Sequence, residues 1–450
     1  MFLLAIRETH DAEPRMQETS AALAASRVPC MIALMTDWNF MTATIVIALF
    51  VLWKLEFAAT ILNLKAFPEK VPDELGGLMD AEKLDQARDY LRVNSRFDMV
   101  KSSASLSLLL VFWFLGGFGW LDDLARSVST NPVIAGLVFL SALFLGQSLF
   151  SIPFSVYETF VIENKFGFNR STPKTFVLDR VKGLALTAVI GLPLGAVVLW
   201  IFGNVEHAWL WAWITVTLFQ LLLTWLAPSV IMPLFNKFTP MPDGDLKSDI
   251  EALGTRCGFP LDGVFVMDGS KRSTKANAFF TGFGKRKKIA LFDTLIDKST
   301  TPELLGVLAH EIGHFRRGHI KQRLAAGIVQ TAVIFFLLGV ATDPSGKFSR
   351  TLFDAFGVKT ISPHVGLVLF SILLEPVSLL LGILLNAWSR KHEFEADAYA
   401  AEVTGDGKPL AEALKKMTAD HLSHPAPARL RVWLEYSHPP LIERLRALGK

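Results

Sequence analysis

Seven apolar stretches, each about as long as a membrane-crossing helix, constrain this chain more than any other feature. They span residues 39–62, 103–121, 133–152, 183–203, 208–227, 324–341 and 363–386. About 20 mainly apolar residues let an α-helix cross the hydrocarbon core of a bilayer. The chain is 51% hydrophobic, and its mean hydropathy is positive, which excludes an ordinary soluble protein. The sequence therefore predicts a mainly α polytopic membrane protein with seven transmembrane helices.

The lysines and arginines predict how these helices are oriented. If each apolar stretch crosses once, four segments lie on the same side and together hold 37 of the 45 basic residues: 63–102, 153–182, 228–323 and 387–450. Short loops rich in Lys and Arg stay on the cytosolic side of a membrane. We therefore expect these four segments in the cytosol and the N-terminus outside.

The same division predicts five parts of the chain. Residues 1–38 are interpreted as a disordered tail, or as a stretch upstream of the true start at Met31 or Met35, with no assigned function. Transmembrane helices 1–5 occupy 39–235, with cytosolic loops 63–102 and 153–182. A cytosolic unit follows at 236–323, helices 6 and 7 occupy 324–386, and a cytosolic C-terminal region occupies 387–450.

The cytosolic unit 236–323 has the pattern of a small α+β fold. A helix near 244–257 precedes a short strand at 264–267, and strands 276–283 and 288–292 flank a glycine- and lysine-rich turn. The basic run 285–288 in that turn is interpreted as a solvated tip, with contact to anionic headgroups as the alternative. The loop 63–102 has helical periodicity and predicts an amphipathic helix.

The stretch from Thr300 to Ile320 predicts one helix that carries a metal-binding pattern. Thr300 with Glu303 forms a capping-box pattern at its start. His310 and His314 are four residues apart, so both imidazoles project from one face of the helix, at a spacing that suits a tetrahedral zinc ion. Glu311 beside them completes His-Glu-x-x-His, in which the glutamate is the general base of a metallopeptidase. The alternative is a pair of histidines on an ordinary surface helix.

A catalytic zinc needs a third protein ligand, and the helical stretch after the seventh apolar segment supplies a candidate. Glu393 and Asp397 are four residues apart on one face. Glu393 is predicted as the third ligand, and Asp397 as the acceptor of a ligand histidine's free N–H. His392 and Glu395 are interpreted as surface groups. The two cysteines match no metal spacing. For Glu393 the alternative is an exposed helical carboxylate.

Three charged residues interrupt the apolar stretches. Lys54 and Glu56 lie in the first and Glu375 in the seventh. Polar groups at such depth face protein or a watery cavity rather than lipid. An internal pair, a snorkelling side chain and a hydrated interior all remain open from the sequence.

Taken together, these motifs resemble the integral-membrane CaaX prenyl proteases, a family of gluzincin peptidases. The resemblance rests on HEIGH at 310–314 together with SRKHEFEAD at 389–397. It extends to YETFVIENKFGFNRST at 157–172, APSVIMPLFNKFTPMPDGDL at 227–246, NAFFTGFG at 277–284 and YSHPPLIERLRAL at 436–448. It covers nearly everything from about residue 40 to 450.

The resemblance implies an arrangement and further site residues. The seven helices would enclose a hydrated chamber that Lys54 and Glu375 face, with a cytosolic zincin-like unit. His438 and Arg444 would approach the scissile carbonyl and stabilise the oxyanion. Substrate would pair with an edge strand formed by Asn277, Ala278, Phe279 and Phe280. His319 is assigned a packing or capping role, and His421 and His424 are left unassigned.

The sequence therefore predicts a zinc endopeptidase with one zinc ion per chain, which cleaves membrane-anchored peptide or protein substrates near the C-terminus. By resemblance these are CaaX-type substrates; the alternative is a bacterial quality-control protease with no need for prenylation. A different class, a transporter or assembly factor with structural zinc, stays open, although Glu311 argues against it.

The bilayer is the expected environment, and no motif for nucleic acid is present. The oligomeric state is not predicted. We expect a bacterial inner membrane, since the end RLRALGK carries no retrieval signal, or the endoplasmic reticulum in a eukaryote.

Overall fold

The computed structural model describes residues 39–281 and 287–449, so the predicted tail 1–38 and residues 285–286 of the predicted basic run lie outside the described residues. Lys287 and Lys288 of that run are the first residues of a strand. The prediction of seven membrane helices is confirmed for this part of the chain. They are α2 (Phe40–Lys65), α3 (Ala81–Phe114), α5 (Pro132–Tyr157), α6 (Pro173–Asn204), α7 (Ala208–Leu226), α11 (His319–Ala341) and α13 (Pro363–Thr404). Two are extended by π-helical turns, α5 by Glu158–Glu163 and α7 by Ala227–Ile231.

The second membrane helix differs from its prediction at both ends. The predicted amphipathic helix and the apolar stretch form one continuous helix, α3, because Asp80 caps its start and no breaker follows. The predicted span 103–121 is wrong at its end. The chain breaks at Gly116, whose φ of 73° lies in the left-handed region that favours glycine. A separate helix, α4 (Gly117–Val128), follows.

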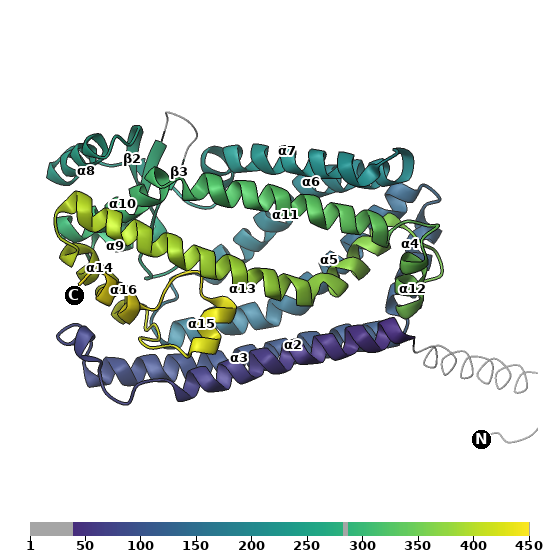
Figure 1. Cartoon of the computed structure of the whole chain (residues 1–450), viewed down its shortest axis with the longest axis horizontal. Helices are drawn as coiled ribbons and strands as arrows, with labels where there is room; N and C mark the ends of the chain where they lie inside the picture. Colours follow the sequence, from purple (N-terminus) through teal and green to yellow (C-terminus); the bar gives the residue numbers. More distant parts are fainter. Residues whose placement is uncertain (1–38, 282–286, 450) are drawn as a thin grey trace, which may run out of the picture.

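The long helices run side by side along the molecule, and most of the small elements lie at its two ends, whereas the short helix α15 (Arg429–Glu435) lies between α13 and α2 (Figure 1). Helix α2 packs against α3, and α7 packs against α6 and α11. Helices α4 and α12 (Lys347–Ala355) lie at one end. The sheet, α8 (Asp245–Arg256) and α10 (Thr301–Arg316) lie at the other end, together with α14 (Lys408–Asp420), α16 (Leu441–Ala447) and the C-terminus.

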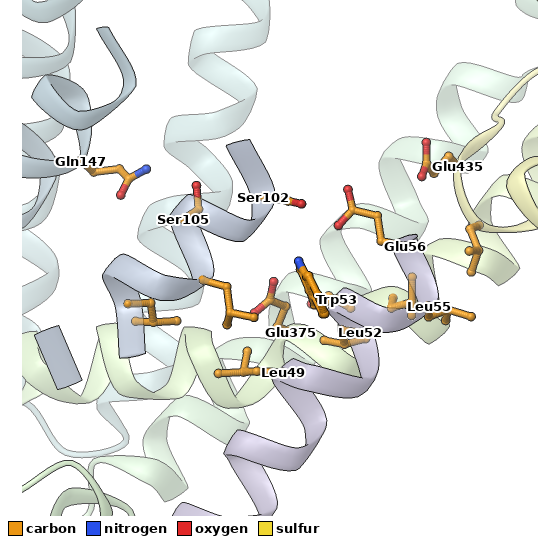
Figure 2. Close-up of a pocket in the computed structure, with 15 residues that line it drawn as sticks. Leu49, Leu52, Trp53, Leu55, Glu56, Ser102, Ser105, Gln147, Glu375 and Glu435 are labelled. Carbon is orange, nitrogen blue, oxygen red and sulfur yellow. The ribbon is translucent and has the colours of Figure 1, made fainter. Parts of the chain in front are cut away.

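A cavity of about 710 Å³ lies between the membrane helices α2, α3, α5 and α13. Its floor is formed by leucines of α2, and three carboxylates, Glu56, Glu375 and Glu435, stand around it (Figure 2). Ser102, Ser105 and Gln147 add further polar groups. Glu375 therefore faces a cavity that is lined by leucines and by other polar side chains. Lys54 is not among the residues that line this cavity; its Nζ atom lies 5.8 Å from the centroid of the Trp53 ring.

The described sheet is mixed, with strand order β1-β2-β4-β3. The strands are β1 (Phe238–Pro240), β2 (Leu261–Met267), β3 (Ala278–Thr281) and β4 (Lys287–Phe292). Strands β2 and β4 are parallel, and β3 is antiparallel to β4 at the end of the order. The β3 strand is thus an edge strand, which leaves one row of its backbone groups for another partner.

The core beneath the sheet joins the predicted cytosolic unit to the C-terminal region. Ile250 of α8, Leu291 of β4 and Leu308 of α10 are fully buried there, together with Ala400 of α13 and Leu410 of α14. Because α10 and the end of α13 share this core, their relative position is set by packing. That packing positions the site described next.

Candidate metal centre

Three side chains from two helices converge at one point. The Nε2 atoms of His310 and His314 lie 3.2 Å apart. The two carboxylate oxygens of Glu393 lie 3.4 Å from His310 Nε2 and 3.3 Å from His314 Nε2. One candidate ligand atom from each residue lies within 4.8 Å of the others. The structure thus brings together the three residues that the sequence predicted as metal ligands.

Two glycines of α10 lie where this helix comes close to α13 and α14. A Cβ atom at Gly313 of α10 would come within 3.1 Å of the Ala396 Cα of α13, and one at Gly306 within 2.9 Å of the Leu410 backbone nitrogen. The contact at Gly306 is too short for a Cβ atom unless the Leu410 backbone moves, and the contact at Gly313 is tighter than ordinary van der Waals packing, so both positions favour glycine. The glycine of His-Glu-Ile-Gly-His therefore lies at the close contact between α10 and α13, the two helices that carry the histidines and Glu393.

The residues present fit a metal ion. Among the described residues, Glu393 Oε2 is a buried carboxylate oxygen with no hydrogen-bond partner, and the side chain is only 2% exposed. A buried charged oxygen without a partner is costly, and a cation at the convergence point would compensate it. Two imidazoles and one carboxylate match the donor set of a catalytic zinc site.

His310 is held from behind by a buried ion pair. Its Nδ1 lies 2.8 Å from Asp397 Oδ1, and Arg444 donates to both oxygens of Asp397 at 2.8 and 2.5 Å. Asp397 thus occupies the position predicted for it, behind a candidate ligand. Arg444 is only 8% exposed, so its side chain has a role at Asp397 in addition to the predicted contact with substrate, which stays a prediction.

His438 lies beside Glu393 at the candidate centre. Its Nε2 atom is 3.5 Å from Glu393 Oε1, and 64% of its side chain is exposed. Ser437 Oγ lies 3.0 Å from its Nδ1. If the serine hydroxyl donates that bond, His438 carries its proton on Nε2 and has a donor at the open side of the site.

Glu311 follows His310 directly on α10. Burial raises the pKa of its carboxyl, and the neighbouring His310 and His314 partly oppose that rise. A carboxylate with a raised pKa binds a proton more readily, which suits a general base.

Three of the four residues predicted to form the substrate strand lie in a strand. Ala278, Phe279 and Phe280 lie in the edge strand β3, and the Asn277 side chain accepts a bond from the Ala278 N–H at 2.8 Å. Phe280 packs edge-on against Phe259. The predicted approach of Asn277 to the metal stays a prediction.

One of the unassigned histidines supports that strand and predicts a pH dependence. His421 Nε2 accepts the Ala276 N–H at 2.9 Å, and burial lowers the pKa of His421 to about 4. Between pH 6.5 and 4 the unfolded chain binds this proton and the folded chain does not, so stability falls with falling pH, by up to about 3 kcal/mol. We expect the apparent Tm of the detergent-solubilised protein to fall less steeply over this range in His421→Gln, whose amide oxygen accepts the same bond without titrating. Parallel curves for the two proteins would contradict the assignment.

Sequence reasoning missed a second group of residues. His319 does not continue the predicted helix 300–320: α10 ends at Arg316, and α11 begins at His319 after Gly318, whose φ is 74°. His392, interpreted as a surface group, is 2% exposed, and Glu395 is hydrogen-bonded to His319. The only signal in the sequence is the glycine directly before His319, and it is ambiguous, because a glycine inside a helix and a glycine that ends one cannot be told apart in a sequence.

Comparisons with known proteins agree with the arrangement. Residues 60–237 match the family described as CAAX prenyl protease N-terminal, five membrane helices, and residues 240–450 match peptidase family M48. The chain is 36% identical over 389 residues to the CAAX prenyl protease 1 homolog of Arabidopsis thaliana, covering 84% of this chain and 90% of that protein. It is 37% identical over 402 residues to CAAX prenyl protease 1 of Saccharomyces cerevisiae, covering 84% and 88%. The crystal structure of S. mikatae Ste24p superposes with a TM-score of 0.83 at 36% identity, covering 91% of this chain and 99% of that one.

Proposed function

This chain belongs to peptidase family M48, with the CAAX prenyl protease N-terminal part, and from that premise we propose that it is a zinc-dependent endopeptidase of membrane-anchored CAAX-type substrates. The observation that carries the proposal is the convergence of His310, His314 and Glu393 on one point, with Glu311 next to the first of them. A structural zinc site has four protein ligands and a closed shell. The described part of the chain offers three at this point.

The residues of the chain divide the reaction between them. A zinc ion held by His310, His314 and Glu393 would polarise the scissile carbonyl and lower the pKa of water. Glu311 takes the proton of the attacking water and returns it to the leaving amine. His438 donates a hydrogen bond to the developing oxyanion. Asp397, held by Arg444, keeps His310 in the orientation in which Nε2 is free.

Strand β3 suits an extended peptide. Its free edge offers backbone groups for strand addition, in which main-chain hydrogen bonds provide much of the affinity and sequence matters less. Asn277, Ala278, Phe279 and Phe280 would form this row. The cavity between the membrane helices places the carboxylates of Glu56, Glu375 and Glu435 among apolar side chains.

The distribution of basic residues supports a cytosolic catalytic site and C-terminus. A substrate anchored in the same bilayer then reaches a site formed by α10 and by the part of α13 that follows its membrane-spanning stretch. The bacterial inner membrane stays a prediction; the relatives named above are eukaryotic proteins.

Replacing His438 and Arg444 by Ala, one at a time, is expected to affect different properties: turnover in the first variant, and stability and zinc affinity in the second. His438→Ala should lower kcat about a hundredfold, because an oxyanion donor is lost, and leave zinc affinity and stability unchanged, because the side chain is largely exposed. Arg444→Ala leaves the buried Asp397 without its cation, so we expect a loss of about 3 kcal/mol of stability and at least tenfold weaker zinc binding. Zinc titration, thermal unfolding and steady-state kinetics measure these effects. Equal zinc affinity in Arg444→Ala would contradict the orienting role.

Cleavage of two peptides by the purified, detergent-solubilised protein tests the substrate class. One peptide ends in a farnesylated CaaX sequence, and the other has the same sequence without the lipid. Release of the last three residues from the farnesylated peptide alone is the expected result. Equal release from both would show that the lipid is not recognised and would favour a general membrane quality-control protease. Cleavage of neither by zinc-loaded protein would overturn the CAAX assignment.

A further inference from the structure

A second chain of hydrogen bonds lies behind the candidate metal centre, on the side of His314. His314 Nδ1 lies 3.0 Å from His319 Nδ1, and His319 Nε2 lies 3.0 Å from Glu395 Oε2. These residues come from three helices, α10, α11 and α13. The catalytic steps proposed above use none of this chain beyond His314.

The carboxylate of Glu395, at the end of this series of hydrogen bonds, determines which ring nitrogens of His319 and His314 carry protons. A carboxylate only accepts hydrogen bonds, so His319 must carry its proton on Nε2 to bond Glu395. A neutral His319 then presents a lone pair on Nδ1, and His314 must donate to it from Nδ1. The Nε2 atom of His314 is left without a proton, which is the form that binds a metal ion. The reverse tautomers would place a proton on His314 Nε2 and block it.

The ring of His319 is also held in its plane. It stacks on His392 with the centroids 3.9 Å apart and the planes at 6°, and the ring centroids of His392 and Trp388 are 4.8 Å apart. His319 and His392 are 1% and 2% exposed. A buried ring in parallel contact with a second ring has little freedom to rotate. Its Nδ1 therefore stays directed at His314.

We propose that Glu395 and His319 are positioning residues that hold His314 in its metal-binding tautomer and orientation. The proposal rests on the metal centre proposed above. The two candidate histidine ligands are then supported differently: His310 by a buried ion pair, His314 by a neutral imidazole linked to a carboxylate whose side chain is 39% exposed. Outer partners of metal-bound histidines change metal affinity by tenfold to a hundredfold when removed.

Zinc affinity, measured by competition with a chromophoric chelator on the full-length protein in detergent, tests this proposal without peptidase activity. We expect Glu395→Ala to bind zinc about tenfold more weakly and His319→Leu up to about a hundredfold more weakly. His319→Asn keeps an acceptor near the Nδ1 position and should recover part of the loss. Lys391→Ala is the matched control. It removes the other charged partner of Glu395, 3.8 Å away, without touching His319, and should bind zinc as the unmodified chain does.

The visible absorption spectrum of the cobalt-substituted protein adds a readout that a purely structural role would not change. Rotation of the His314 ring alters the ligand field, so the band positions should shift in Glu395→Ala and stay unchanged in Lys391→Ala. If His319→Leu does not fold, the zinc affinities and cobalt spectra of Glu395→Ala and His319→Asn still test the proposal. Zinc affinities within about threefold of the unmodified chain, with an unshifted cobalt spectrum, would overturn the proposal. Absence of stoichiometric zinc in the unmodified chain would instead overturn the metal centre itself.

Discussion

Replacing Glu311 with Gln is expected to abolish nearly all turnover while zinc remains bound. The amide cannot accept the proton of the attacking water, and a positioned general base contributes about a hundredfold to ten-thousandfold to a rate. Gln has nearly the same size, and Glu311 is outside the set of three converging ligand atoms. Zinc affinity should therefore stay within about threefold of the unmodified chain. The measurement is kcat on the farnesylated peptide together with zinc stoichiometry on the same preparation.

The control for this variant is Glu402→Gln, which makes the same change at an exposed carboxylate of α13. It should retain full activity. Full activity in Glu311→Gln would remove the general base from the mechanism. Loss of zinc together with turnover would show instead that Glu311 belongs to the ligand set.

Replacing Glu393 with Ala should remove both zinc and activity. Glu393 contributes the carboxylate at the convergence point, and its Oε2 atom has no hydrogen-bond partner among the described residues. Two histidines one turn apart leave an incomplete site, so we expect affinity to fall by more than the hundredfold that loss of an outer partner costs. Metal analysis after dialysis measures this, with Glu402→Ala as the matched control. Unchanged metal content would mean that another residue supplies the third ligand.

The two variants separate binding from turnover. Glu311→Gln is expected to keep the metal and lose the reaction, whereas Glu393→Ala is expected to lose both. Both residues lie on helices that share one core, so a general destabilisation would affect the two variants in the same way. It would therefore not produce a variant that keeps the metal and another that loses it.

Much of the architecture could be predicted because hydropathy is a local property. Each membrane helix carries its own apolar stretch, and the capping box of Thr300 and Glu303 marks the start of α10 directly. The breaks at Gly116 and Gly318 could not be predicted in the same way. A glycine inside a helix and a glycine with positive φ look identical in a sequence, and packing decides between them.

Some contacts of the candidate site could likewise be predicted from local spacing, and others could not. His310 with His314, and Glu393 with Asp397, are spaced four residues apart, so helix geometry alone places each pair on one face. His319 and Glu395 are 76 residues apart and meet only because α11 and α13 pack together. Arg444 reaches Asp397 from a third helix, α16. Such contacts depend on tertiary packing, which no local spacing encodes.

The most direct test of the central claim is metal removal and restoration on one preparation. The purified protein would be stripped with a chelator, titrated with zinc, and assayed by mass spectrometry on the farnesylated CaaX peptide. We expect no cleavage without metal, and full release of the last three residues when one zinc ion per chain is restored. Cleavage that persists in metal-free protein, or zinc-saturated protein that cleaves no peptide, would contradict the account.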